Sequence, residues 1–140
     1  MLGVIPARAG SKGIPGKNSR LLCGVPLIVH SIWAARSAQG LARTVVSTDS
    51  DDIARIAKEY RGDVPFQRPA HLASDTASMW DVIKHALAVM EQLDDVVYDA
   101  VALLDPTNPF RTGAEIDAAI GQLDADEDCD GVVGVTRPEA

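Results

Sequence analysis

The chain has 140 residues, of which 46% are hydrophobic and 24% are charged, and its formal net charge is −7. We expect one domain spanning residues 1–140 with a hydrophobic core. The negative charge argues against general nucleic-acid binding, which needs a basic face, and no apolar run approaches the roughly 20 residues of a membrane span. The chain starts without a signal-peptide pattern and its two cysteines match no metal spacing. We therefore expect a cytoplasmic protein with reduced thiols.

Strand and helix patterns alternate along the chain. Continuous apolar or β-rich runs predict strands, and apolar residues at helical spacing predict helices. We expect strands at residues 2–7, 44–47, 99–104 and 131–136 and helices at 26–39, 51–60, 76–93 and 112–123, with an irregular segment at 62–73. The last helix begins with the capping-box pattern from Thr112 to Glu115.

This alternation predicts an α/β fold with a mostly parallel sheet and right-handed βαβ crossovers. Ligands in such sheets bind beyond the carboxyl ends of the strands. Arg8, Asp49 and Asp105 each follow a predicted strand, so we expect them to meet at one edge of the sheet. For Asp49 we favour a structural role, because an aspartate at a strand end often forms a cap or a turn.

The loop after the first predicted strand combines glycines with cations. Glycine lets the backbone approach a ligand closely, and successive backbone N–H groups can form a concavity for an anion. The loop therefore predicts a cradle for a polyphosphate, built from Arg8, Gly10, Lys12, Gly13, Gly16 and Lys17. The spacing fits neither a Walker A loop nor the G-x-G-x-x-G dinucleotide fingerprint. From these residues alone, a basic surface loop with ordinary turn glycines remains the alternative.

The run from Ile5 to Asn18, IPARAGSKGIPGKN, resembles the signature loop of the N-acylneuraminate (sialic acid) cytidylyltransferases. Other segments match that family in the same order: VSTDS at 46–50, RPAHLASDTAS at 68–78 and LLDPTNPFR at 103–111. The resemblance covers essentially the whole chain and implies a Rossmann-like nucleotide-diphospho-sugar transferase fold with three αβα layers. Family members normally continue with an aspartate pair for magnesium and a dimerisation element. We therefore expect a C-terminally truncated or shortened member, and homodimerisation is left open.

The resemblance implies that a sugar-acid hydroxyl attacks the α-phosphorus of CTP, giving a CMP-sugar and pyrophosphate. It also implies Mg²⁺ or Mn²⁺ as cofactor, because the phosphates and the leaving group need charge stabilisation. Arg8, Lys12 and Lys17 are the candidate catalytic cations, and Arg68 matches an arginine near the cytosine base. The predicted nucleotide-binding residues are Arg8, Gly10, Ser11, Lys12, Lys17, Asn18 and Arg68. For Ser74, Asp75 and Thr76 we favour capping of the following helix.

Asp105 departs from the glutamine that sialic acid enzymes usually place there for sugar contact. A carboxylate at this edge can contact the sugar or bind Mg²⁺, because hard cations prefer carboxylate oxygen. Arg111 matches an arginine near the sugar and can pair with a substrate carboxylate. Met79 is a second departure, since these enzymes often have serine there. Together the departures leave the sugar open among N-acetylneuraminic, legionaminic and pseudaminic acids.

We therefore predict a cytidylyltransferase that binds CTP and an acidic, sialic-acid-like sugar, without nucleic acid or membrane as partner. One alternative is a nucleotidyltransferase for another sugar and another NTP. A second alternative is a truncated nucleotide-binding domain without turnover.

Overall fold

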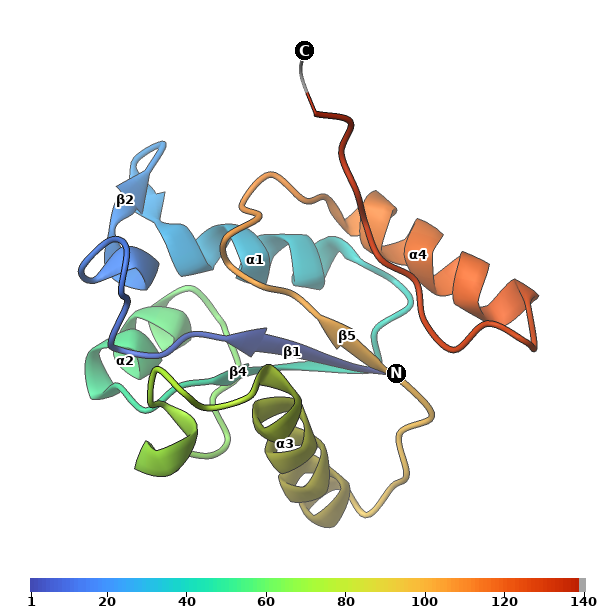
Figure 1. The fold of residues 1–140 in the computed structure, drawn as a ribbon, viewed down its shortest axis with the longest axis horizontal. Helices are drawn as coiled ribbons and strands as arrows, with labels where there is room; N and C mark the ends of the chain where they lie inside the picture. The colour runs from blue at the N-terminus through green and yellow to red at the C-terminus, as the bar shows by residue number, and fades with distance from the viewer. Residues whose placement is uncertain (139–140) are drawn as a thin grey trace.

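A three-stranded parallel sheet lies at the centre of the computed structural model, which describes residues 1–138 (Figure 1). The strands are β1 (Leu2–Pro6), β4 (Arg43–Ser47) and β5 (Val101–Leu103), and β1 lies between the other two. In the strand register, Leu2 of β1 is paired with Arg43 of β4 on one side and with Val101 of β5 on the other. Because all three strands are parallel, their carboxyl ends meet at one edge, which confirms the predicted α/β fold.

Among residues 1–138, four α-helices connect and cover the strands close to the predicted positions. They are α1 (Leu27–Ser37), α2 (Asp51–Glu59), α3 (Met79–Asp94) and α4 (Gly113–Ala125). The capping box at Thr112 is present, with the hydroxyl accepting from Glu115 N and the Glu115 carboxylate accepting from Thr112 N. Within residues 1–138, no helix combines the length and the apolar character that crossing a bilayer requires.

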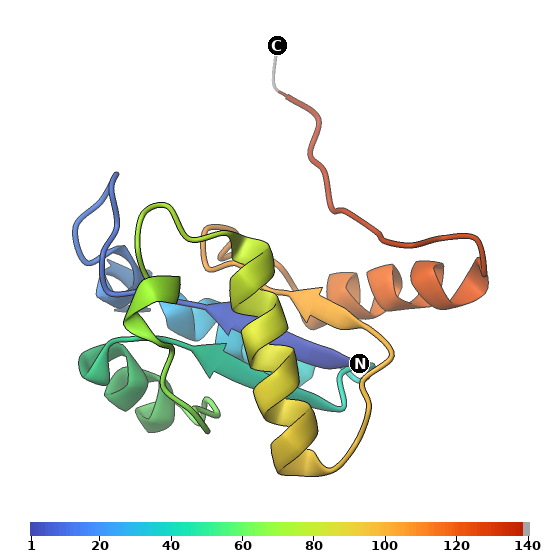
Figure 2. The ribbon, with the colours of Figure 1, turned by 60° about the horizontal axis from the view of Figure 1, so that its bottom comes forward.

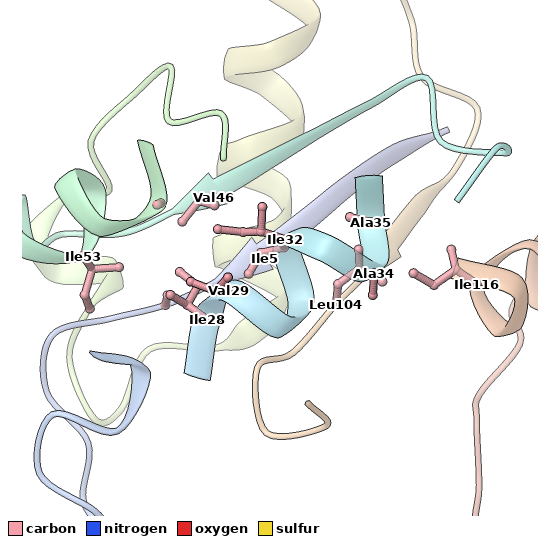
Figure 3. Close-up of a cluster of buried hydrophobic side chains, with 12 residues drawn as sticks. Ile5, Ile28, Val29, Ile32, Ala34, Ala35, Val46, Ile53, Leu104 and Ile116 are labelled. Carbon is pink, nitrogen blue, oxygen red and sulfur yellow. The ribbon is translucent and has the colours of Figure 1, made fainter. Parts of the chain in front are cut away.

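The sheet buries both of its faces. Ile5 and Val46 point to one face, where they pack against side chains of α1, α2 and α4 (Figure 3). Leu2, Val4 and Val45 point to the other face, where α3 crosses the sheet (Figure 2). Side chains alternate between faces along a strand, so every residue of β1 can be buried. The result is the predicted three-layer αβα arrangement.

A short antiparallel hairpin precedes α1 and was not predicted. Its strands are β2 (Leu21–Leu22) and β3 (Val25–Pro26), joined by Cys23 and Gly24 with φ angles of 52° and 84°. Both turn residues have left-handed backbone conformations. Asn-Gly and Asp-Gly pairs predict such a turn clearly, and a Cys-Gly pair does not. Two 3-10 helices, Lys17–Ser19 and Ala70–Leu72, were also not predicted.

The predicted strand at residues 131–136 is wrong. After α4 the described chain runs out from the sheet without forming a strand, as Figure 2 shows. Val133 and Val135 are 82% and 87% exposed. Valine favours a pleated, half-buried surface, but a strand also needs a neighbour for its backbone hydrogen bonds. In residues 1–138 this segment has no such neighbour.

Candidate functional site

The loop after β1 starts at the edge where the carboxyl ends of the strands meet. Ala7 N donates to Ser47 O at 2.9 Å, which continues the pairing of β1 with β4. Ala9 N then donates to Asp49 Oδ1 at 2.8 Å. Asp49 therefore ties the loop after β1 to the end of β4, and the structural role expected for this carboxylate is confirmed.

The glycines of the loop have different roles. Gly16 has a φ of 63°, a left-handed conformation that favours glycine. A Cβ added at Gly10 or Gly13 would meet no described atom within 4 Å, so crowding in the protein itself does not require glycine there. Ser11 lies between them and is partly exposed. The open surface at Gly10 agrees with close approach by a ligand, and this role stays a prediction.

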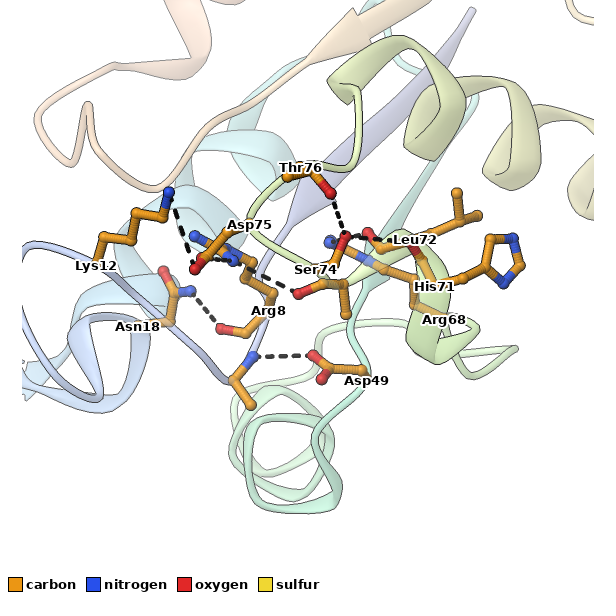
Figure 4. Close-up of polar contacts among 12 residues, drawn as sticks. Arg8, Lys12, Asn18, Asp49, Arg68, His71, Leu72, Ser74, Asp75 and Thr76 are labelled. Carbon is orange, nitrogen blue, oxygen red and sulfur yellow. Dashed lines mark hydrogen bonds and ion pairs between the residues drawn. The ribbon is translucent and has the colours of Figure 1, made fainter.

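Two of the predicted cations come together around one carboxylate (Figure 4). Arg8 Nη1 donates to Asp75 Oδ1 at 2.7 Å and to Ala73 O at 3.5 Å. Lys12 Nζ lies 3.9 Å from Asp75 Oδ2. The hydrogen bond from Arg8, with the charges of Lys12 and Arg8, holds the pKa of Asp75 below its ordinary value. The structure thus gathers two cationic side chains at this edge of the sheet.

Asp75 does not cap the following helix, so the predicted capping role is wrong. The cap of α3 is Ser78, whose Oγ accepts from Trp80 N at 3.2 Å. Ser74 and Thr76 lie within hydrogen-bond distance of each other at 3.3 Å. Several residues here have capping side chains, and local preference cannot choose among them. The available signal for Asp75 was its acidic side chain within the segment 68–78, which resembles a segment of the cytidylyltransferases.

Asn18 and Lys17 lie where the loop closes. Asn18 is 6% exposed, and its Nδ2 donates to Arg8 O at 3.2 Å. Its Oδ1 is buried and meets no partner in the described part of the chain. Lys17 begins the 3-10 helix and is partly exposed. The side-chain amide of Asn18 therefore joins the end of the loop to its beginning through Nδ2, and its Oδ1 accepts no hydrogen bond from the described residues.

Arg68 lies beneath the site and supports the end of β4. It is only 4% exposed, its Nε donates to Ser47 Oγ at 3.0 Å and its Nη2 donates to Ser47 O at 2.6 Å. Nη1 reaches Leu72 O at 3.4 Å. The pKa of Arg68 is lowered, chiefly by burial and also by the charge of Arg8, and nearby Asp49 opposes this shift. The contact between Arg68 and a base stays a prediction, whereas its hydrogen bonds to Ser47 and Leu72 are present in the structure.

Asp105 and Arg111 belong to the loop after β5, at the same edge. Leu104 N donates to Val4 O at 2.9 Å, which places Asp105 beside the end of β1. Asp105 Oδ1 accepts from Thr107 N at 2.9 Å and from Thr107 Oγ1 at 2.8 Å. Arg111 Nη2 donates to Asp105 O at 3.1 Å, whereas its Nη1 is buried with no partner among residues 1–138. Burial lowers the pKa of Arg111.

Two cavities of the protein lie away from this site. One cavity of about 320 Å³ lies between α1 and β4, and another of about 280 Å³ lies beside α2. None of the residues that line either cavity belongs to the loop at 8–18 or to the loop at 105–111. The candidate site is therefore identified by its chemistry and by its place in the sheet, and not by either of these two cavities.

Comparison with known proteins defines the class. The family model described as Cytidylyltransferase matches residues 2–137. A CMP:2-keto-3-deoxy-manno-octonic acid synthetase solved in complex with CTP shares the fold, with a TM-score of 0.71 over 91% of this chain and 48% of that one, at 24% identity. The chain belongs to the cytidylyltransferase family.

Two curated relatives refine the comparison. A CMP-N,N'-diacetyllegionaminic acid synthase from Legionella pneumophila is 48% identical over 120 residues, which are 86% of this chain and 51% of the relative. An N-acylneuraminate cytidylyltransferase from Escherichia coli O18:K1:H7 is 39% identical over 137 residues, 98% of this chain and 31% of the relative. The chain therefore spans about half the length of the first relative and about a third of the second.

Proposed function

We propose that this chain is the CTP-binding part of an enzyme that activates a sialic-acid-like sugar acid. The reaction converts CTP and the sugar acid to a CMP-sugar and pyrophosphate. The observation that carries the proposal is the convergence of Arg8 and Lys12 at the carboxyl edge of a parallel sheet. Membership of the cytidylyltransferase family supports the choice of CTP over other nucleotides.

In this reaction a hydroxyl oxygen of the sugar bonds to the α-phosphorus and gives up its proton to the solvent. The bond from that phosphorus to the β-phosphate oxygen breaks, and pyrophosphate leaves. Negative charge accumulates on the transferred phosphoryl group and on the departing pyrophosphate. Arg8, Lys12 and Lys17 stabilise that charge, together with the exposed backbone N–H groups around Gly10 and Ser11. These residues act by position and charge, because nucleotidyl transfer needs little covalent help from the protein.

Mg²⁺, or Mn²⁺, belongs to the proposal as a cofactor. Mg²⁺ commonly binds one or two carboxylates together with substrate phosphates and water. Asp105 fits such a site, because Oδ1 is held by Thr107 and this orients the carboxylate at the strand edge. When bound, the metal neutralises phosphate charge. Contact between Asp105 and the sugar is the competing role for this residue.

The remaining side chains fit the nucleoside and the sugar acid. The unused acceptor of Asn18 suits a hydroxyl donor such as ribose, which reaches it only if the loop shifts, because Oδ1 is buried. The unused Nη1 of Arg111 suits the carboxylate of a sugar acid, which likewise reaches it only if the loop shifts, because Nη1 is buried. The relatives support nonulosonic acids as the class, with N-acetylneuraminic, legionaminic and pseudaminic acids as the candidates.

A cytoplasmic location completes the proposal. Cys23 and Cys129 are free thiols in the described structure, as is usual in a reducing compartment. Homodimerisation remains a prediction, tested by the molar mass from light scattering. We propose neither nucleic acid nor membrane as a partner, in keeping with the net charge of −7.

The proposal is tested by nucleotide binding followed by turnover. With Mg²⁺ present, CTP should raise the melting temperature more than ATP, GTP or UTP does. A larger shift with another nucleotide would reject cytidine specificity. Pyrophosphate release is then measured with CTP and each candidate sugar acid. CTP binding without release for any acid would instead support the second alternative, a nucleotide-binding domain without turnover.

Asp105 is tested in the same assays. Asp105→Asn should shift the Mg²⁺ titration of CTP binding to higher concentration if the carboxylate is a metal ligand. An unaltered titration together with a raised KM for the sugar acid would assign Asp105 to sugar contact.

A further inference from the structure

We propose that Asp75 acts as an internal substitute for a phosphate group, and that the triphosphate must displace it from Arg8 and Lys12. This inference rests on the proposed function, because it concerns the same cations. Its starting point is the pair of contacts in Figure 4: Oδ1 of Asp75 accepts from Arg8 at 2.7 Å and Oδ2 lies 3.9 Å from Lys12.

The two oxygens of one carboxylate engage the two cations of the loop. A carboxylate oxygen and a phosphate oxygen are both anionic acceptors, and Arg and Lys bind both through charge-assisted hydrogen bonds. The N–H donors of Arg8 and Lys12 therefore cannot bind Asp75 and a triphosphate fully at the same time. A bound triphosphate would also repel the Asp75 carboxylate if it stayed in place.

The position of Asp75 allows it to leave. Its side chain is 49% exposed, whereas that of Arg8 is 28% exposed. Asp75 lies in the connection between the 3-10 helix Ala70–Leu72 and α3, outside both helices. Moving it breaks two ion pairs at the surface, one with the partly buried Arg8 and one with the exposed Lys12. Exposed ion pairs contribute little to stability, so this displacement costs the fold little.

The arrangement has two consequences for binding. Without nucleotide, Asp75 keeps Arg8 and Lys12 directed at one point, so the cradle is already formed. With nucleotide, the competition lowers affinity, and the same competition favours release of pyrophosphate after the reaction. Asp75 is thus a positioning residue that limits how tightly the cradle holds polyphosphates.

The test is calorimetric titration of the chain with inorganic tripolyphosphate at low salt and without divalent metal. Asp75→Asn should bind about three- to tenfold more tightly than the wild type, because it removes the competing charge. Asp81→Asn is the matched control: it removes the same charge nearby, where Asp81 pairs at 2.8 Å with Lys84 on the surface of α3. It should leave the affinity unchanged. Equal or weaker binding by Asp75→Asn would overturn the inference.

Thermal unfolding gives a second readout. Without ligand, Asp75→Asn should melt no higher than the wild type, since it loses two ion pairs. With tripolyphosphate, its melting temperature should rise by more than that of the wild type. If Asp75 only ordered the loop, Asp75→Asn would lower both the melting temperature without ligand and its rise with tripolyphosphate. This result would contradict competition.

CTP separates this inference from the proposed function. If the wild type binds CTP and Asp75→Asn binds polyphosphate no more tightly, the inference fails alone. If neither protein binds CTP or tripolyphosphate, the cradle itself is wrong and both proposals fail together.

Discussion

Lys12 contributes charge from the open side of the loop. Its side chain is 70% exposed and its partner Asp75 is also exposed, so it has little part in folding. We predict that Lys12→Ala weakens CTP binding by about 1.5–3 kcal/mol, the usual contribution of a hydrogen bond to a charged group, which is at least about tenfold in Kd. The measurement is calorimetric titration with CTP and Mg²⁺.

Lys84 provides the control for Lys12. Its side chain is also 70% exposed and also pairs with an aspartate, Asp81. Lys84→Ala should leave both CTP affinity and the melting temperature unchanged. Equal losses of affinity in the two variants would mean that Lys12 acts only through net charge.

Arg68 differs from Lys12 because its guanidinium is buried. Arg68→Met would leave the hydroxyl of Ser47 and the carbonyl of Leu72 without their donor. It would also remove one of the two donors to the carbonyl of Ser47, the other being Ala7 N. We predict a loss of about 2–4 kcal/mol in the free energy of unfolding, as expected when a buried polar network loses one member. The loss is measured by urea denaturation.

The comparison variant for Arg68 is Arg55→Met. The side chain of Arg55 is 61% exposed and pairs with Glu59 one turn away on α2. Its removal should cost less than about 1 kcal/mol. If Arg68→Met kept full stability and lost CTP affinity, contact with the base would be its main role.

Helix packing depends on the start of α4 lying close to the end of α1. A Cβ at Gly113 would overlap Ser37 Oγ and lie 2.7 Å from Ala38 N. Nearby, Asp117 accepts from Gln39 N and Gly40 N and so ties the two helices together. We predict that Gly113→Ala destabilises the protein by about 1–3 kcal/mol through overpacking, as measured by urea denaturation.

Gly121, in the same helix, should respond in the opposite direction. A Cβ there would meet no described atom within 4 Å. Gly121→Ala should therefore stabilise the protein by about 0.5–1 kcal/mol, because alanine loses less backbone entropy in a helix. A loss of similar size in both variants would contradict the packing argument for Gly113.

The opposite edge of the sheet has a structural charge network. Arg43 pairs with Asp63 at 2.9 Å and also with Asp94, which accepts from the Tyr98 hydroxyl. The bond to Asp63 and the nearby aspartates raise the pKa of Arg43. This network joins β4 to the end of α3. Ion pairs at the amino ends of the strands thus hold elements together, whereas those at the carboxyl ends face the candidate site.

The stability of the whole molecule should depend on His85 in weakly acidic solution. His85 lies on α3, with its ring centroid 5.3 Å from that of Phe66, and its Nδ1 is buried with no partner in the described structure. Burial, with the charges of Arg68 and His71, lowers the pKa of His85 from its usual 6.5. The unfolded chain therefore binds the proton more readily than the folded protein does.

The sign of the pH effect follows from this difference. The contribution of neutral His85 to stability is complete above pH 6.5 and is lost as pH falls through the lower folded pKa. We predict that the free energy of unfolding declines over this range and that His85→Gln reduces the decline. Urea denaturation on both sides of pH 6.5 measures it. An equal decline in His85→Gln would assign the effect to other groups. Asp75 and Asp99 are not among them, because their pKa values lie below 3.8 and they titrate only in stronger acid.

Most of the architecture could be predicted because burial imposes a period on the sequence. The continuous apolar run in β1 and the helical spacing in α2 and α3 each reflect contact with a core. Residues 131–136 show the limit of this reasoning. Their valines have strand propensity, but within residues 1–138 the segment has no strand to pair with. The hairpin β2–β3 shows the converse, since its short strands and Cys-Gly turn leave almost no pattern.

The sequence alone determined the alternation of β1, β4 and β5 with the α-helices, the family resemblance and the cations of the loop, because each depends on residues close together in the chain. Only the tertiary structure decided which charges meet. Arg8 and Asp75 are 67 positions apart, and no spacing rule relates them. Likewise, Arg68 belongs to a motif expected at the nucleotide, yet its guanidinium is buried against β4. Pairing between distant side chains depends on how the layers pack, and that information is spread over the whole chain.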